Sequence, residues 1–145
     1  MSSTTARKRR AAFRAVKHIE NGMVIGLGSG STALQAIKMI GELLDSGELY
    51  DIMGVPTSSQ TMFESIKMKI PLTTLDEYPQ LDLGLDGADQ IDNKLNAIKG
   101  GGGALFREKI IAAACKEYIL MADNTKITET LGIGQLLPIE VYPFA

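Results

Sequence analysis

Residues 99–109 carry the side chains that proton transfer beside a carbonyl group requires. The segment reads KGGGGALFREK, so Lys99 precedes four glycines and Glu108 follows them. Glycines leave backbone N–H groups accessible to a ligand, Lys99 adds a cation, and Glu108 is a potential base. The pattern is typical of a site that moves a proton next to a developing oxyanion. A flexible loop leading into a solvated helix start has the same composition, so this stretch alone leaves both interpretations open.

The segment at residues 26–32, GLGSGST, has the residue types of a phosphate-binding loop. Its glycines permit close approach of a ligand, a predicted helix begins within it, and its hydroxyl side chains add donors. The dinucleotide pattern G-x-G-x-x-G is not met, because Ser31 occupies the third glycine position, and no G-K-[ST] signature is present. We therefore expect phosphate binding, with a tight, hydroxyl-capped strand-to-helix turn as the structural alternative.

Two further loops carry charged side chains after predicted strands. The sequence DGAD at residues 86–89 places two carboxylates three residues apart, which suits a metal site, a general acid–base pair or hydroxyl acceptors for a sugar. Lys126 can reach a phosphate as a point charge. Asx turns at residues 86–89 and a solvated lysine at 126 are the structural alternatives. His18 and Cys115 lie outside these motifs, and we expect His18 to be structural or exposed and Cys115 to be a small core residue rather than a nucleophile.

The hydrophobic pattern alternates between helical and strand-like segments. It predicts helices at residues 4–20, 32–44, 57–68 (capped by Thr57, Ser58 or Ser59) and 104–115, and strands at 23–27, 50–55, 72–75, 81–85 and 118–122. This alternation predicts an α/β fold: one Rossmann-like three-layer domain over residues 1–145, with a mostly parallel sheet and helices on both faces. Ligands bind at the carboxyl ends of strands in such sheets, so we expect the polar loops to meet there.

The composition narrows the class of protein. Of the 145 residues, 45% are hydrophobic and 22% are charged, which is typical of a globular domain. The net charge of −2 argues against a nucleic-acid ligand. A single cysteine indicates a reducing compartment, and no apolar run approaches the roughly 18 residues that a bilayer span needs. These features predict a cytoplasmic protein without nucleic-acid or membrane partners.

The ordered set of motifs resembles that of ribose-5-phosphate isomerase, type A. In chain order, residues 28–33 resemble the family's phosphate loop, residues 86–89 its D-G-A-D signature, and residues 99–111 its catalytic block. Ala122-Asp123 with Lys126 resembles a further substrate segment. The resemblance extends from about residue 8 to residue 144, and it is far more specific than any one motif.

The resemblance implies an aldose–ketose isomerase of the pentose phosphate pathway. Such an enzyme interconverts D-ribose 5-phosphate and D-ribulose 5-phosphate through an enediolate, with no metal and no organic cofactor. By position, Glu108 is implied to be the base, with Asp86 and Lys99 assisting ring opening and proton handling. The implied substrate-binding residues are Ser29, Gly30, Ser31, Thr32, Asp86, Gly87, Ala88, Asp89, Lys99, Gly100, Gly101, Gly102 and Lys126. Lys8 is implied to add a charge near the phosphate.

The resemblance also bears on length, assembly and alternatives. Family members continue beyond Ala145, so we expect a shortened chain that lacks a small C-terminal α+β domain and a final returning strand and helix. We also expect a homodimer or homotetramer. The alternative function is a sensor-like domain that binds a sugar phosphate without converting it. That domain needs the phosphate loop but neither Lys99 nor Glu108, so the presence of both residues favours the enzyme.

Overall fold

A computed structural model describes residues 3–143 of the chain. The helices are α1 (Ser3–Val16), α2 (Gly30–Ser46), α3 (Ser59–Lys67), α4 (Leu105–Ala114) and the short 3₁₀ helix η1 (Asn124–Lys126). The strands are β1 (Val24–Leu27), β2 (Met53–Pro56), β3 (Leu81–Gly87), β4 (Gln90–Ile91), β5 (Ala97–Ile98) and β6 (Cys115–Met121). None of the helices within residues 3–143 is long and apolar enough to cross a membrane.

Four strands form a parallel sheet in the order β2-β1-β3-β6. Strand β1 lies in the middle, with Gly26 paired to Val55 on one side and to Gly84 on the other. A second, two-stranded sheet is formed by β4 and β5, which pair antiparallel. The predicted α/β fold with a mostly parallel sheet is confirmed.

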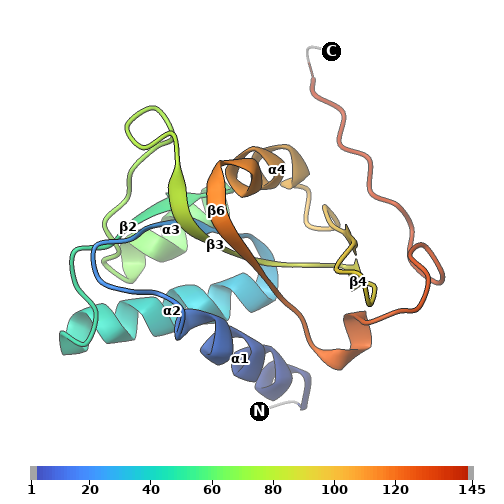
Figure 1. The fold of residues 1–145 in the computed structure, drawn as a ribbon, viewed down its shortest axis with the longest axis horizontal. Helices are drawn as coiled ribbons and strands as arrows, with labels where there is room; N and C mark the ends of the chain where they lie inside the picture. Colours follow the sequence, from blue (N-terminus) through green and yellow to red (C-terminus); the bar gives the residue numbers. More distant parts are fainter. Residues whose placement is uncertain (1–2, 144–145) are drawn as a thin grey trace.

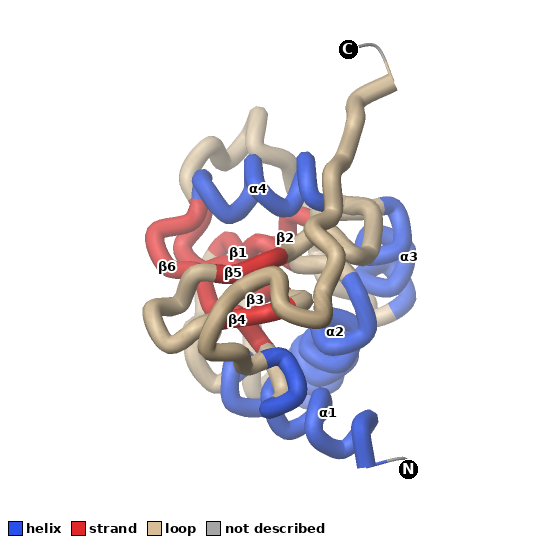
Figure 2. The backbone as a smooth tube through the Cα atoms, turned by 90° about the vertical axis from the view of Figure 1, so that its right-hand side faces the viewer, coloured by secondary structure: helices blue, strands red, loops and turns tan. Residues whose placement is uncertain are grey.

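Helices cover both faces of the sheet (Figures 1 and 2). Helices α1 and α2 pack together on one face, where Ile25 and Leu27 of β1 meet Ile37 and Ile40 of α2 in the main core. Helix α4 lies on the other face, and its Ile111 belongs to a second, smaller core cluster. The sheet is therefore buried on both sides, as its apolar strands require.

Several predicted boundaries differ from the structure. The strand predicted at residues 72–75 is wrong, because only Leu72 forms an isolated bridge, to Gly54. Strand β2 begins at Met53 rather than at residue 50, and α1 ends at Val16 rather than at residue 20. Cys115, predicted to end a helix, is instead the first residue of β6. Short apolar runs fit either assignment when a long-range pairing decides the outcome.

Candidate active site

A cleft of about 160 Å³ opens where the loops after β1 and β3 meet the glycine run. It is lined by Lys8, Ser29, Gly30, Ser31, Thr32, Gly87, Ala88, Asp89, Lys99, Gly100, Gly101, Gly102, Glu108 and Lys126. The structure thus brings together all the predicted site residues except one. The exception is Asp86, which is 1% exposed and lies beneath the cleft.

Close packing of β1 against β3 places the phosphate loop directly on Asp86. The Gly28 amide donates to the Leu85 carbonyl at 2.8 Å. A Cβ on Gly28 would lie 2.2 Å from Asp86 Oδ1 and 2.6 Å from the Asp86 Cα. Only a glycine therefore lets the two loops approach this closely.

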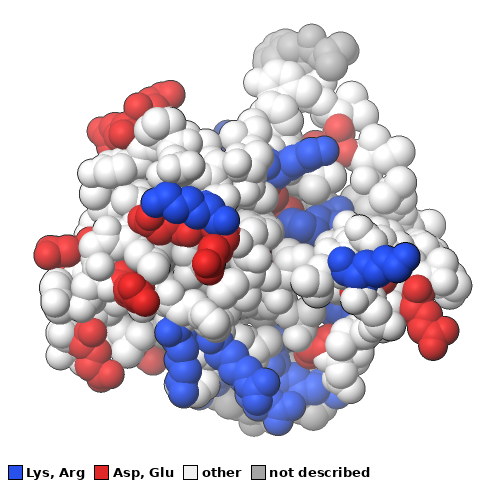
Figure 3. Space-filling view, in the orientation of Figure 1, with Lys and Arg blue, Asp and Glu red and all other residues white. Residues whose placement is uncertain are grey.

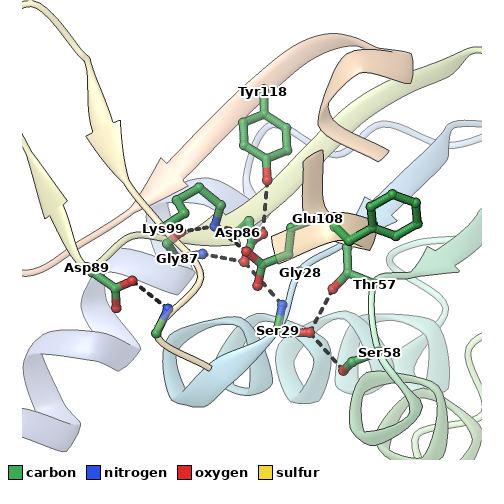
Figure 4. A network of polar contacts seen from close by, with 12 residues as sticks. Gly28, Ser29, Thr57, Ser58, Asp86, Gly87, Asp89, Lys99, Glu108 and Tyr118 are labelled. Carbon is green, nitrogen blue, oxygen red and sulfur yellow. Dashed lines mark hydrogen bonds and ion pairs between the residues drawn. The ribbon is translucent and has the colours of Figure 1, made fainter. Parts of the chain in front are cut away.

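Both oxygens of the Asp86 carboxylate are fully engaged by donors (Figure 4). Oδ1 accepts from the amides of Ser29, at 3.1 Å, and Gly87, at 2.7 Å. Oδ2 accepts from the Tyr118 hydroxyl and forms an ion pair with Lys99 Nζ, each at 2.9 Å. These four contacts fix the position of the buried Asp86 carboxylate beneath the cleft.

Lys99 joins this carboxylate to a second one. Its Nζ lies 2.9 Å from Asp86 Oδ2 and 3.3 Å from Glu108 Oε2, and it also donates to the Gly87 carbonyl. Glu108 is 4% exposed, on the first turn of α4. Its Oε2 has the ion-pair distance to Lys99 but no hydrogen-bond partner within residues 3–143. Glu108 Oε2 is therefore a buried acceptor that carries no hydrogen bond within those residues.

Opposing influences act on the Glu108 carboxyl group. Burial removes it from water and, as the largest effect, raises its pKa. The negative charge of Asp86 raises the pKa further, whereas Lys99 lowers it. The net pKa lies above the ordinary value for glutamate. A raised carboxylate pKa favours proton exchange with a weakly acidic carbon acid.

The glycine run closes one wall of the cleft. Gly100 and Gly103 have φ of 98° and 75°, a left-handed conformation that other residues rarely adopt. The Gly101 amide donates to Asp89 Oδ2 at 2.8 Å, and the Gly103 amide to the Gly100 carbonyl. The Gly101 amide is therefore already engaged by the Asp89 carboxylate. The amides of Gly100 and Gly102 have no hydrogen-bond partner within the described part of the chain.

Two further lysines, Lys8 and Lys126, line the cleft. Lys8 on α1 donates to Ser31 Oγ at 2.8 Å, and Ser31 lies in the first turn of α2. Lys126 lines the same cleft from η1. Figure 3 shows Lys and Arg side chains along the lower edge of the molecule, over α1. A lysine at the amino end of α2 and a second lysine in the wall of the same cleft are suited to an anion.

The hydroxyl of Ser29 is engaged in hydrogen bonds within the protein. Ser29 Oγ lies 2.8 Å from both Thr57 Oγ1 and Ser58 Oγ, as Figure 4 shows. Ser58, one of three predicted caps, accepts from the Thr61 amide at 3.1 Å and is the N-cap of α3. Thr61 Oγ1 in turn donates to the Gly28 carbonyl. These contacts anchor the phosphate loop to the start of α3.

Sequence reasoning gave Tyr118 no role, and it named Asp123 only as part of the segment that resembles a further substrate segment. Tyr118, on β6, donates a hydrogen bond to Asp86, and it belongs to no sequence motif that would have identified it. Asp123 is 8% exposed and accepts from the Thr125 amide at 2.9 Å, which orients the turn that carries Lys126. No group of three or more His, Cys, Asp or Glu side chains within residues 3–143 is arranged to hold a metal ion.

The fold and the cleft define an α/β protein with a lysine-lined cleft above a buried lysine–carboxylate cluster. The fold alone is shared with the translation initiation factor eIF-2B of Pyrococcus horikoshii OT3, at 20% identity and a TM-score of 0.61, over 91% of this chain and 51% of that one. A likeness at that level of identity defines the architecture, and the family is defined by closer relatives.

Residues 53–145 match the family described as ribose 5-phosphate isomerase A (phosphoriboisomerase A). The chain is 49% identical to ribose-5-phosphate isomerase A of Desulfatibacillum aliphaticivorans, over 100% of this chain and 63% of that protein. It is 50% identical to probable ribose-5-phosphate isomerase 3, chloroplastic, of Arabidopsis thaliana, over 94% of this chain and 50% of that one. The chain belongs to the ribose 5-phosphate isomerase A family.

Solved structures agree with this assignment. D-Ribose-5-phosphate isomerase in complex with phospho-erythronic acid superimposes with a TM-score of 0.86 and 46% identity, over 87% of this chain and 55% of that one. The enzyme of Methanocaldococcus jannaschii gives a TM-score of 0.85 and 40% identity, over 90% and 57%. The chain spans about half to just under two thirds of the length of the curated relatives it matches.

Proposed function

We propose that the protein interconverts D-ribose 5-phosphate and D-ribulose 5-phosphate, an aldose–ketose isomerisation of the pentose phosphate pathway. The observation that carries the proposal is the position of Lys99 Nζ between two buried carboxylates, 2.9 Å from Asp86 and 3.3 Å from Glu108, in the wall of a cleft that Lys8 and Lys126 also line. A buried base and a cation in one cleft match the needs of proton transfer beside a carbonyl.

The phosphate of the substrate occupies the basic end of the cleft. Lys8, Ser31, Thr32 and Lys126 line that end, and the amino terminus of α2 adds the positive end of its dipole. Anchoring the phosphate there holds the sugar carbons toward Glu108. Positioning of this kind lowers the barrier by restricting the substrate before the reaction begins.

Glu108 moves one proton between the two carbons of the open-chain sugar. In the direction from aldose to ketose, the Glu108 carboxylate removes the proton from C2. The electron pair of the C2–H bond then forms the C1–C2 double bond of the enediolate. The former aldehyde oxygen gains the negative charge. Glu108 then returns the proton to C1, while the C2 hydroxyl passes its proton to the O1 oxyanion, so that C2 becomes the ketone and C1 carries a hydroxyl. No atom is gained or lost overall.

The remaining groups act on the oxygens of the sugar. Lys99 is positioned to stabilise the enediolate charge, together with the unpaired amides of Gly100 and Gly102. Each preorganised donor of this type contributes on the order of 3 kcal/mol. Asp86 holds Lys99 in place through their 2.9 Å ion pair, and with Lys99 it supports ring opening. Asp89 also lines the cleft, and its carboxylate accepts hydrogen bonds from hydroxyl groups of the sugar.

The alternative function, a sugar-phosphate sensor without turnover, is less favoured by the same geometry. A binding domain gains nothing from burying Glu108 beside Asp86, because two close carboxylates in a low-dielectric site cost stability. Costly buried charges that face a cleft are typical of catalytic sites.

The decisive experiment measures ribulose 5-phosphate formation from ribose 5-phosphate, with excess chelator, for the chain and for Glu108→Gln. We expect turnover in the parent and a loss of about 10²- to 10⁴-fold in the variant, because the amide cannot accept the proton. Glu117→Gln, on the exposed part of β6, is the matched control. Near-normal turnover by Glu108→Gln would refute the assignment of the base.

If neither form turns over substrate, thermal stabilisation of the folded chain by ribose 5-phosphate decides the remaining question. Stabilisation would favour the sensor-like alternative for this chain. Absence of stabilisation would leave family membership without an intact site.

We propose further that the protein assembles as a homodimer or homotetramer and acts in the cytoplasm. Exposed apolar side chains at Leu136, Ile139 and Val141 support self-association. Light scattering on the purified chain tests it, and a monomer at micromolar concentration would contradict it. Imaging of the tagged protein tests the compartment, since one relative is named as chloroplastic.

A further inference from the structure

Tyr118 is a half-buried polar neighbour of the site that the proposed mechanism does not use. Its hydroxyl donates to Asp86 Oδ2 at 2.9 Å, the same oxygen that holds Lys99. The tyrosine therefore touches the carboxylate that aligns the lysine (Figure 4).

The sheet is built to admit this ring. Tyr118 on β6 pairs with Gly84 on β3, and a Cβ on Gly84 would lie 2.4 Å from the tyrosine ring. Asp86 follows Gly84 by two residues, so it projects from the same face about 6.6 Å further along the strand. The missing side chain at Gly84 leaves the ring free to lie along β3 and reach Asp86.

We propose that Tyr118 is a positioning residue, whose hydroxyl fixes the Asp86 carboxylate and thereby sets where Lys99 is held and at which pH Glu108 ionises. The hydroxyl hydrogen faces the carboxylate, so its dipole stabilises negative charge in the cluster. Its loss leaves Asp86 Oδ2 with Lys99 as sole partner, and the negative field at Glu108 increases.

The charged and titratable groups around the hydroxyl come from every element packed against it. Asp86 lies on β3, Glu108 on α4, Lys99 follows β5, and Cys115 lies on β6 itself. Burial and then the Asp86 charge raise the pKa of Tyr118, so its hydroxyl stays protonated while the carboxylates titrate. Burial raises the pKa of the Cys115 thiol to about 11. Across the acidic range, Tyr118 is therefore a constant donor.

The test replaces Tyr118 by Phe, which keeps the ring in place and removes only the oxygen. The control is Tyr50→Phe, because Tyr50 is exposed and outside the cleft. Carbon-13 NMR follows the Glu108 carboxyl group through a pH titration, with its resonance assigned by its absence in Glu108→Gln. The same variants are assayed for turnover across pH.

We expect Tyr118→Phe to raise the Glu108 midpoint by about half a unit to one unit and Tyr50→Phe to leave it unchanged. The acid limb of kcat shifts upward by the same amount, with little change in KM. Equal midpoints in Tyr118→Phe and the parent would overturn the inference.

The inference rests on the proposed function only for its effect on turnover. If Tyr118→Phe shifts the Glu108 midpoint in a chain that lacks turnover, the role of Tyr118 is supported. Only the proposed isomerase function is then contradicted. If Tyr118→Phe does not fold, the parent protein labelled at tyrosine Cζ gives a second test. One tyrosine resonance must then respond at the Glu108 midpoint, and the lack of such a response overturns the inference.

Discussion

At the scale of single residues, Glu108 shows how a common side chain acquires an uncommon proton affinity. Its carboxyl group is buried and faces Asp86, and Lys99 offsets only part of that cost. The sequence places a glutamate after a glycine run, but burial and the second carboxylate depend on the folded chain. The pKa of Glu108 is raised as a result.

The raised pKa predicts the pH dependence of turnover. The base must be ionised, so the rate falls as pH drops through the Glu108 pKa, and this acid limb lies above the ordinary pKa of glutamate. Lys99→Met removes the group that lowers this pKa, so any residual activity has its acid limb at still higher pH. A pH–rate profile checks both statements, and an acid limb at the ordinary glutamate value would contradict them.

Asp86→Asn predicts a loss of both stability and turnover. Three of the four groups around the carboxylate, the Ser29 and Gly87 amides and Lys99 Nζ, can only donate, so an amide NH₂ group placed there loses at least one hydrogen bond. We expect a decrease of about 1–3 kcal/mol in the free energy of unfolding and at least a tenfold lower rate. Chemical denaturation and the isomerase assay measure these effects. Asp76→Asn, at an exposed position, is the control, and equal stability of the two variants would count against the donor network.

At the scale of elements, the site depends on two loops that pack against each other at the ends of β1 and β3. Gly28 and Asp86 are in contact there. The glycine run shows the opposite case at Gly102, where an added Cβ would meet nothing within 4 Å. A side chain is therefore excluded at Gly28 but has room at Gly102.

This difference predicts opposite outcomes for two identical substitutions. Gly28→Ala forces the loop away from the Asp86 backbone and lowers the free energy of unfolding by about 1–3 kcal/mol. Gly102→Ala leaves that free energy nearly unchanged. Denaturant titration of both variants makes the comparison, and equal stabilities would show that the contact between the loops is not tight.

At the scale of the whole molecule, the cleft joins segments from both ends of the described chain. Lys8 on α1 and Lys126 on η1 line it from opposite ends of the sequence. Ligand binding at their junction links these segments, so it stabilises the entire fold.

Ribose 5-phosphate is therefore predicted to raise the unfolding temperature of the chain. At 100 times Kd the gain is about 2.7 kcal/mol. Lys8→Ala and Lys126→Ala each reduce the shift at a fixed ligand concentration, whereas Lys69→Ala, at a solvated position, retains it. Differential scanning calorimetry measures these shifts, and equal shifts in all three variants would place the phosphate elsewhere.

Much of the molecule was predictable from its sequence. The alternation of helices and strands gave the parallel sheet and its class, because these patterns are local and strongly periodic. The spacing of residues 26–32, 86–89 and 99–109 brought the candidate site together at the carboxyl ends of strands. The chemistry of the site follows from which residue types stand after which strands.

Tertiary structure decided the features that depend on distant partners. The Ser29 amide and Asp86 are 57 residues apart in sequence, and Tyr118 reaches Asp86 only because Gly84 leaves room for its ring. The same cause removed the predicted strand at residues 72–75, which finds only one bridging partner. The sequence by itself determined the kinds of groups present, while burial and long-range contact determined the proton affinity of Glu108 and the orientation of Lys99.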